Sequence, residues 1–215
     1  GVNENNILVT GNTVIDALLS VSKKIDANSE FYENYFSSNY GIYFNDKKTI
    51  LVTGHRRESF GSGFENICNA LKEISQTNII QIIYPVHMNP KVQEPVHRIL
   101  RNLKNVHLIP PQDYLPFIFL MKNANIIITD SGGVQEEAPS LGKPVLVMRD
   151  TTERPEGVKA GTARLIGTNQ IEIVKAVNNL LNNDGEYNRM SHAVNPYGDG
   201  TTSYSILDYI TKYLS

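Results

Sequence analysis

The stretch Ile126–Ala138, which reads IIITDSGGVQEEA, determines how the rest of this chain is interpreted. The β-branched run at its start is typical of a buried strand. The small residues Ser131, Gly132 and Gly133 then predict a tight turn, and the segment after them can begin a helix. Because the first N–H groups of a helix have no partner within it, anions bind there. The stretch therefore predicts a strand, a turn and a helix that together hold a phosphate-bearing ligand.

Apolar runs of strand length alternate with amphipathic helical segments from about Lys48 onward. Each run is continuous, which is typical of parallel strands covered on both faces. This order predicts an α/β fold with a doubly wound parallel sheet. The expected strands are Thr49–Thr53, Ile79–Tyr84, Val106–Ile109, Asn125–Thr129 and Pro144–Met148.

Two of the helices between these strands have recognisable start signals. Ser62 and Glu65 fit a capping box, in which each side chain bonds to the backbone of the other residue. Asn169 predicts the start of another helix. The apolar face of that helix is expected to consist of Ile171, Val174, Val177 and Leu181.

The two ends of the chain differ from this pattern. Ile7–Thr10 resembles the end of a strand whose sheet lies outside this chain, and Gly11–Leu19 predicts a turn followed by a helix. Ser29–Ser38 predicts a second short helix, and Thr202–Leu214 a further amphipathic one. The chain begins with Gly1 and lacks an initiator Met, so we expect a processed or partial piece of a longer protein.

The composition argues against several function classes. The net charge is −2 over 215 residues with no long basic run, which argues against nucleic acid as a partner. The apolar runs are too short for a membrane span, and the N-terminus lacks a secretory signal, so no membrane partner is expected. Cys68 is the only cysteine, which excludes an internal disulfide and predicts a reducing, cytoplasmic location. Neither CxxC nor HExxH spacing occurs, so no metal site is expected.

Polar side chains follow each of the expected strands. Ligands on a doubly wound sheet bind beyond the carboxyl ends of its strands. We therefore expect one edge of the sheet to gather His55, Arg56, His87, Gln112, Ser131 and Arg154.

The basic and histidine loops at this edge each have two interpretations. The loop of His55 and Arg56 suits a diphosphate, or it is a surface loop in which Arg57 pairs with Glu58. His87 is a candidate ligand contact, or a histidine satisfied by the backbone of its loop. The sequence leaves both choices open.

The later loops carry the same ambiguity. Gln112 and Phe117 suit a base-binding slot, or Phe117 packs into the core. Glu137 lies on the helical face of Gly133 and is placed to accept ribose hydroxyls, or it is a solvated acid favoured by the helix dipole. Arg154 lies in a polar loop, where it can bind a sugar or a phosphate.

Five ordered blocks of this chain resemble the non-hydrolysing UDP-N-acetylglucosamine 2-epimerases. They extend over most of residues 7–167, which makes the resemblance specific. The blocks are Val9–Asp16, Gly54–Glu58, Tyr84–Pro90, Pro111–Phe117, and Thr129–Pro144 continued through Arg149–Glu156.

The resemblance implies a glycosyltransferase-B-like architecture, in which two Rossmann-like domains hold the nucleotide sugar between them. This chain would be the C-terminal, UDP-binding half of a homodimeric enzyme. Residues 1–45 would be hinge helices from the end of a missing N-terminal domain, 46–199 the Rossmann-like domain and 200–215 a C-terminal helix. The carboxylates that move the proton at C2 would lie in the missing domain.

The family reaction interconverts UDP-N-acetylglucosamine and UDP-N-acetylmannosamine by elimination and re-addition of UDP, without redox cofactor or metal. By resemblance, His55 would contact the diphosphate and aid the departure of UDP. The N–H groups of Ser131, Gly132 and Gly133 would hold phosphate. Glu137 would accept the ribose hydroxyls.

The remaining roles that the resemblance implies concern the base, the sugar and regulation. Gln112 and Phe117 would surround the uracil, and Arg154 would contact the sugar or phosphate. Arg56 and His87 resemble positions that touch a second, activating UDP-N-acetylglucosamine in some bacterial members. A UDP-sugar glycosyltransferase, a hydrolysing epimerase and a non-catalytic nucleotide-sugar-binding module remain alternatives.

Overall fold

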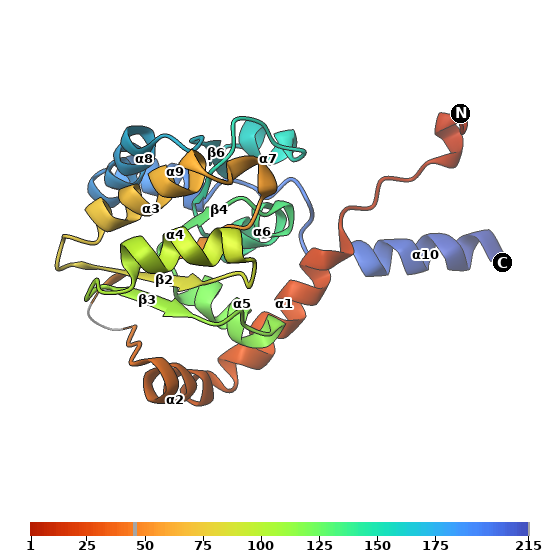
Figure 1. The fold of residues 1–215 in the computed structure, drawn as a ribbon. Coiled ribbons are helices and arrows are strands. Elements are labelled where there is room, and N and C mark those ends of the chain that lie inside the picture. Colours follow the sequence, from red (N-terminus) through yellow and green to blue (C-terminus); the bar gives the residue numbers. More distant parts are fainter. Residues whose placement is uncertain (45–46, 215) are drawn as a thin grey trace.

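One sheet of six parallel strands forms the centre of the molecule (Figure 1). The computed structural model describes residues 1–44 and 47–214. The strand order is β3-β2-β1-β4-β5-β6, so the chain reverses its direction of winding between β1 and β4. This confirms the doubly wound, Rossmann-like sheet predicted from the sequence. The strands are β1 (Lys48–Thr53), β2 (Ile80–Pro85), β3 (Val106–Ile109), β4 (Ile126–Thr129), β5 (Val145–Val147) and β6 (Ala163–Leu165).

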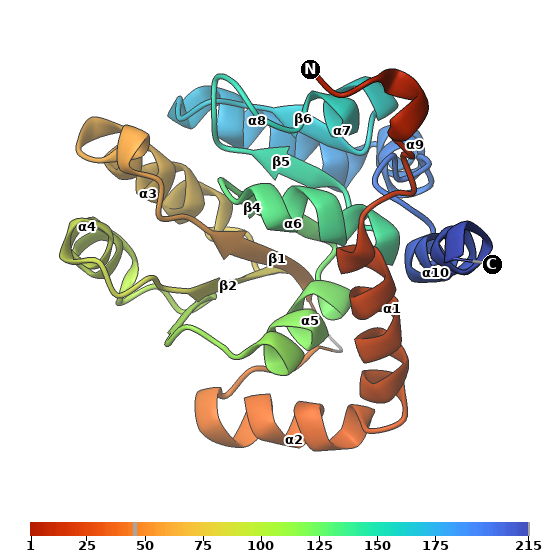
Figure 2. The ribbon, with the colours of Figure 1, turned by 90° about the vertical axis from the view of Figure 1, so that its right-hand side faces the viewer.

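Helices cover both faces of this sheet, as Figure 2 shows for α3 and α4 on one side and α1 and α5 on the other. The helices are α1 (Thr13–Asp26), α2 (Ser29–Tyr40), α3 (Ser62–Ile74), α4 (Pro90–Leu100), α5 (Tyr114–Asn123), α6 (Gly132–Glu137), α7 (Pro155–Ala160), α8 (Gln170–Asn182), α9 (Asp184–Ser191) and α10 (Thr202–Leu214). Short 3-10 segments occupy Glu4–Asn6, Arg57–Ser59 and Ala138–Leu141.

Alternate residues of the strands feed two apolar cores. In β1, Ile50 and Val52 pack with α3, α4 and α8, whereas Leu51 faces the core built from α1, α2 and α5. All three side chains are fully buried. This two-sided burial explains why the strands are continuous apolar runs in the sequence.

The first two helices belong to the second core. Leu18 of α1 and Phe36 of α2 are fully buried, and the Phe36 ring stacks on Phe119 with centroids 5.6 Å apart and planes 10° apart. The predicted domain boundary between residues 45 and 46 lies outside the described residues and stays a prediction. In this structure α1 and α2 share a core with the sheet.

The start of α3 differs from the predicted capping box. Gly61, not Ser62, is the N-cap, and its φ of 83° suits glycine. Ser62 makes no cap hydrogen bond, and the Glu65 N–H donates to Gly61 O at 3.2 Å. The Glu65 carboxylate instead pairs with Arg98. The helix thus starts one residue earlier than the motif indicates.

The predicted start of α8 is confirmed, and its predicted apolar face is confirmed except at Ile171. Asn169 accepts hydrogen bonds from the N–H groups of Ile171 and Glu172 at 2.9 and 3.3 Å. Ile171 itself is 72% exposed. The side chains that α8 buries are Ile173, Ala176, Val177 and Leu180. Of the other predicted positions, Val177 is fully buried, and Val174 and Leu181 are partly buried against the same core.

Both chain ends project from the same side of the domain (Figure 1). No strand forms at Ile7–Thr10, which we expected to be the end of a strand whose sheet lies outside this chain. The helix α10 forms with its predicted bounds, and the Asp16 carboxylate of α1 accepts from the Ser203 N–H at 2.8 Å. Within residues 1–44 and 47–214, no helix has the length and apolar character that a membrane span requires.

The packing of α2 leads to a stability prediction. Phe36→Ala should lower the free energy of unfolding by about 3–5 kcal/mol, because it removes a fully buried ring from the core. Phe31→Ala is the matched control in the same helix, since Phe31 is 65% exposed, and its loss should be under about 1 kcal/mol. Urea unfolding measures both, and equal losses would show that α2 is not packed on the domain.

Candidate functional site

The residues predicted to form a site follow neighbouring strands at one edge of the sheet. His55 follows β1, His87 follows β2, Gln112 follows β3, Ser131 follows β4 and Arg154 follows β5. Because these five strands are adjacent and parallel, their carboxyl ends lie along the same edge. The structure thus gathers the predicted residues as the sequence indicated.

A buried carboxylate joins two of these strand ends. Asp130 is 1% exposed, and its Oδ2 accepts hydrogen bonds from the N–H groups of His55 and Arg56, both at 2.7 Å. Gly54 precedes them, and a Cβ there would lie 3.2 Å from the Tyr84 hydroxyl. The loop after β1 is therefore fixed to the end of β4. Sequence reasoning assigned no role to Asp130.

The two histidines of the site form a pair. The imidazole rings of His55 and His87 stack with centroids 5.1 Å apart and planes 17° apart. The Asn89 N–H donates to Nδ1 of His87 at 3.1 Å, so the backbone of its loop satisfies one of its nitrogens. Both side chains are exposed at the sheet edge. This stacking was not predicted, since it depends on the β1 and β2 loops meeting in space.

The glycine turn presents fewer N–H groups than the sequence suggested. The Ser131 N–H donates to Oγ1 of Thr129 at 3.0 Å, so it already has a partner. Gly132 and Gly133 are the first two residues of α6, where backbone N–H groups have no acceptor within the helix. Any phosphate at this turn would therefore be held chiefly by Gly132 and Gly133.

Arg154 lies directly against this turn. A Cβ added to Gly132 would lie 3.7 Å from the Arg154 guanidinium carbon. The guanidinium donates to Oε1 of Glu136, and the other Glu136 oxygen accepts from Nδ2 of Asn12 at 2.7 Å. The Tyr197 hydroxyl donates to the Arg154 carbonyl at 3.3 Å. These contacts hold the arginine beside Gly132 and connect it to the start of α1.

Glu137 is buried, so its interpretation as a solvated acid is wrong. It is 7% exposed, and the Tyr114 hydroxyl donates to its Oε1 at 2.7 Å. Burial raises the pKa of Glu137, although the hydrogen bond from Tyr114 lowers it. The predicted contact with ribose hydroxyls stays a prediction. Tyr114 is an additional polar group beside it.

Gln112 and Phe117 lie at the start of α5. The Gln112 amide donates to the Pro110 carbonyl at 2.7 Å and accepts from the Tyr35 hydroxyl of α2 at 3.3 Å. Phe117 is half-buried and packs against the core under α1 and α2. Core packing therefore accounts for part of the Phe117 side chain, and the base-binding role of both residues stays a prediction.

The basic loop after β1 does not contain the local ion pair between Arg57 and Glu58 that the sequence allowed. Glu58 accepts from Arg149 at 2.6 Å, so the suggested pairing with Arg57 is wrong. Arg149 also bonds to Glu153 at 2.5 Å, and this contact lowers the pKa of Glu153 to about 2. Glu153 is therefore charged at neutral pH and is unsuited to proton transfer. No group of His, Cys, Asp or Glu within the described ranges is arranged to hold a metal ion.

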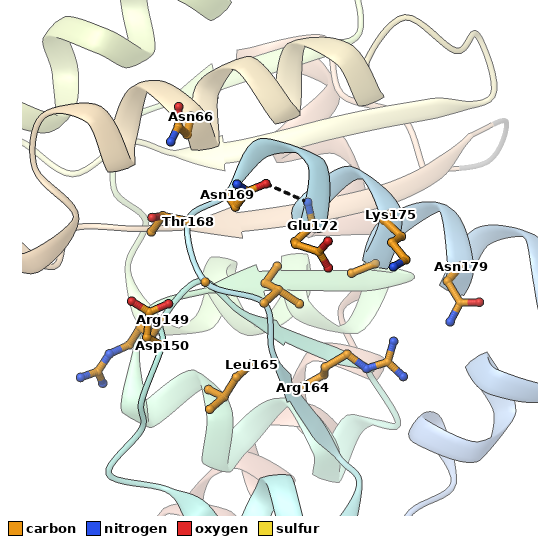
Figure 3. Close-up of a pocket in the computed structure, with 13 residues that line it drawn as sticks. Asn66, Arg149, Asp150, Arg164, Leu165, Thr168, Asn169, Glu172, Lys175 and Asn179 are labelled. Carbon is orange, nitrogen blue, oxygen red and sulfur yellow. Dashed lines mark hydrogen bonds between the residues drawn. The ribbon is translucent and has the colours of Figure 1, made fainter.

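A separate cavity of ≈ 940 Å³ lies between α3, β6 and α8 (Figure 3). Its lining includes Arg149 and Arg164, but none of the predicted site residues that the structure describes. Both arginines already have carboxylate partners, Glu58 and Glu153 for the first and Glu186 for the second. Neither arginine of this cavity is therefore free of an ion-pair partner.

The family model described as UDP-N-acetylglucosamine 2-epimerase matches residues 1–211 of this chain. The chain belongs to this family. A UDP-N-acetylglucosamine 2-epimerase of Escherichia coli is 60% identical over 208 residues, which cover 96% of this chain and 55% of that protein. Another, of Campylobacter jejuni, is 52% identical and covers 99% of this chain and 56% of its own length. The chain thus spans about half the length of the curated relatives it matches.

Solved structures of 2-epimerases share the fold. The Neisseria meningitidis enzyme bound to UDP-GlcNAc is 43% identical with a TM-score of 0.91, covering 98% of this chain and 57% of that one. The S. aureus MnaA–UDP structure is 44% identical with a TM-score of 0.87, covering 98% of this chain and 55% of that one. The family and the fold class predicted from the sequence are thereby confirmed.

The burial of Glu137 leads to a pH-dependent prediction. Its raised pKa means that the folded state keeps the proton to a higher pH than the unfolded state. The free energy of unfolding of wild type relative to Glu137→Gln should therefore fall as pH rises through 4.5 to the raised pKa. Urea unfolding between about pH 4 and 8 measures this difference.

Tyr114→Phe is the companion variant in this titration. It removes the hydrogen bond that lowers the pKa of Glu137, so the fall should become larger and extend to higher pH. A free-energy difference that rose with pH would contradict the proposed environment, because it would show that folding favours the charged carboxylate.

Proposed function

We propose that this chain forms the UDP-binding half of an enzyme that interconverts UDP-N-acetylglucosamine and UDP-N-acetylmannosamine by elimination and re-addition of UDP. The observation that carries the proposal is the placement of Arg154 against the glycine turn of α6, at the same sheet edge as the His55–His87 pair, in a member of this family. Solved relatives named as complexes with UDP-GlcNAc and with UDP support the choice of nucleotide.

The leaving group would be held at the glycine turn. The N–H groups of Gly132 and Gly133 point out of the first turn of α6 and suit phosphate oxygens. Arg154 adds a positive charge, which Glu136 keeps in place. His55 would contact the diphosphate and donate a proton to it as the bond to the sugar breaks. Fixed donors of this kind stabilise the charge that develops on departing UDP.

The nucleoside would extend toward the start of α5. Glu137 and Tyr114 would meet the ribose hydroxyls, and Gln112 with Phe117 would surround the uracil. Tyr35 of α2 bonds to Gln112, and Tyr114 bonds to Glu137, so both parts of this proposed polar and aromatic strip are held by hydrogen bonds. Such a strip offers acceptors to the sugar and a flat wall to the base.

Two further parts of the proposal concern regulation and the second half of the enzyme. Arg56 and His87 would contact a second, activating UDP-N-acetylglucosamine. The proton at C2 would be moved by carboxylates outside this chain, which spans about half of its curated relatives. The buried free thiol of Cys68 fits a reducing, cytoplasmic location.

The proposal predicts binding without turnover. The 215-residue chain should bind UDP in calorimetry, and it should not convert UDP-N-acetylglucosamine alone. Conversion should appear in a version that also carries the N-terminal half of a relative, followed by NMR of the sugar C2 proton. Turnover by the chain alone would contradict the proposal that carboxylates outside it move the proton at C2. Release of free N-acetylmannosamine by the longer version would indicate a hydrolysing enzyme.

The glycine turn provides a variant that separates binding from folding. In Gly133→Ala the added Cβ meets only Ser131 Oγ, at 3.9 Å, so the fold should tolerate it. The same methyl group occupies the approach to the N–H, so the Kd for UDP should rise about tenfold or more.

Gly63→Ala is the matched control for this measurement. Gly63 is likewise the second residue of a helix that follows a strand, and its Cβ would meet Thr168 Oγ1 at an ordinary 3.5 Å. This variant should bind UDP as wild type does. A Gly133→Ala protein that folds and binds UDP with unchanged affinity would remove the glycine turn from the proposed site.

A further inference from the structure

We propose that Asp130 is a positioning residue that keeps a proton on Nδ1 of His55 and so directs Nε2 of that ring toward the ligand. The role assigned to the outward nitrogen rests on the proposed function, whereas the proton placement rests on the geometry of this chain. Nothing in the sequence pattern singled out Asp130 for such a role.

The first step is that the Asp130 carboxylate cannot turn. Its Oδ2 accepts from two consecutive backbone N–H groups, those of His55 and Arg56, at 2.7 Å each. Asp130 is 1% exposed, so no solvent competes for these bonds. With Oδ2 fixed in this way, the direction of Oδ1 is determined as well.

The second step concerns this other oxygen. Oδ1 of Asp130 is buried and has no hydrogen-bond partner among the residues that the structure describes. Nδ1 of His55 lies 3.6 Å from it. A buried carboxylate oxygen without a donor is unfavourable, and the oxygen can only accept. The imidazole side chain is 44% exposed, so a small rotation is free to close the gap.

The third step comes from the stacked partner ring. The Asn89 N–H donates to Nδ1 of His87, so that nitrogen must carry a lone pair, and neutral His87 has its proton on Nε2. Its ring is stacked on that of His55, with centroids 5.1 Å apart. The two neighbouring histidines therefore hold opposite tautomers, each set by a different neighbour.

This arrangement determines what His55 can do. With Nδ1–H directed at Asp130, only Nε2 faces outward. When Nε2 is protonated it donates to a phosphate oxygen, and on transferring that proton it becomes neutral while Nδ1–H stays on the carboxylate side. Asp130 touches no ligand in this scheme, and it acts through the ring that it orients.

The test is the tautomer of each ring in the chain itself, read from two-bond 1H–15N correlations at about pH 8.5, above the usual titration range of histidine. His55→Asn and His87→Asn assign the signals among the five histidines. Wild type should show Nδ1–H for His55 and Nε2–H for His87. The opposite tautomer for His55 in wild type would overturn the proposal without any variant.

Asp130→Asn sharpens the test. The two backbone N–H groups need the amide oxygen, so the NH2 group must replace Oδ1 and face His55. A donor there should switch His55 to Nε2–H and leave His87 unchanged. A folded Asp130→Asn protein, judged by its circular dichroism, in which His55 keeps Nδ1–H would overturn the proposal. Because the measurement needs no nucleotide, its result is independent of whether UDP binds.

Discussion

Two hydrogen bonds from the backbone of residues 55 and 56 to the Asp130 carboxylate hold the functional edge of the sheet together. They tie the end of β1 to the end of β4, which are the two strands between which the winding of the chain reverses. A buried charge is stable only while its hydrogen bonds are kept, so these two bonds leave the loop little freedom. The histidine loop on one side and the glycine turn on the other therefore have a fixed relative position.

Around this fixed pair of strand ends, the site is built from charges that are already partly matched. Glu136 neutralises Arg154, and Glu58 with Glu153 neutralises Arg149. Beside these paired arginines, the predicted site offers backbone N–H groups at the glycine turn and two exposed imidazoles. A site of free arginines would hold a diphosphate more tightly and release it more slowly.

The sequence predicted the strands well because burial on both faces produces continuous apolar runs. It missed β6, which has three residues, and it misplaced the start of α3, where the conformation of Gly61 moves the cap. In the site, it found the residues that follow the strands. It could not find the partnership of Glu136 with Asn12 or of Asp130 with His55, because those residues are 124 and 75 positions apart.

The stacking of Phe36 on Phe119 has a consequence for how the chain is made. At a synthesis rate of about 5–20 residues per second, the second ring emerges roughly 4–17 s after the first. Throughout that interval Phe36 lacks the Phe119 ring, although nearer residues such as Phe44 are already available to it. The core shared by α1, α2 and α5 is therefore completed only after α5 has been synthesised, so the first two helices finish packing later than they form.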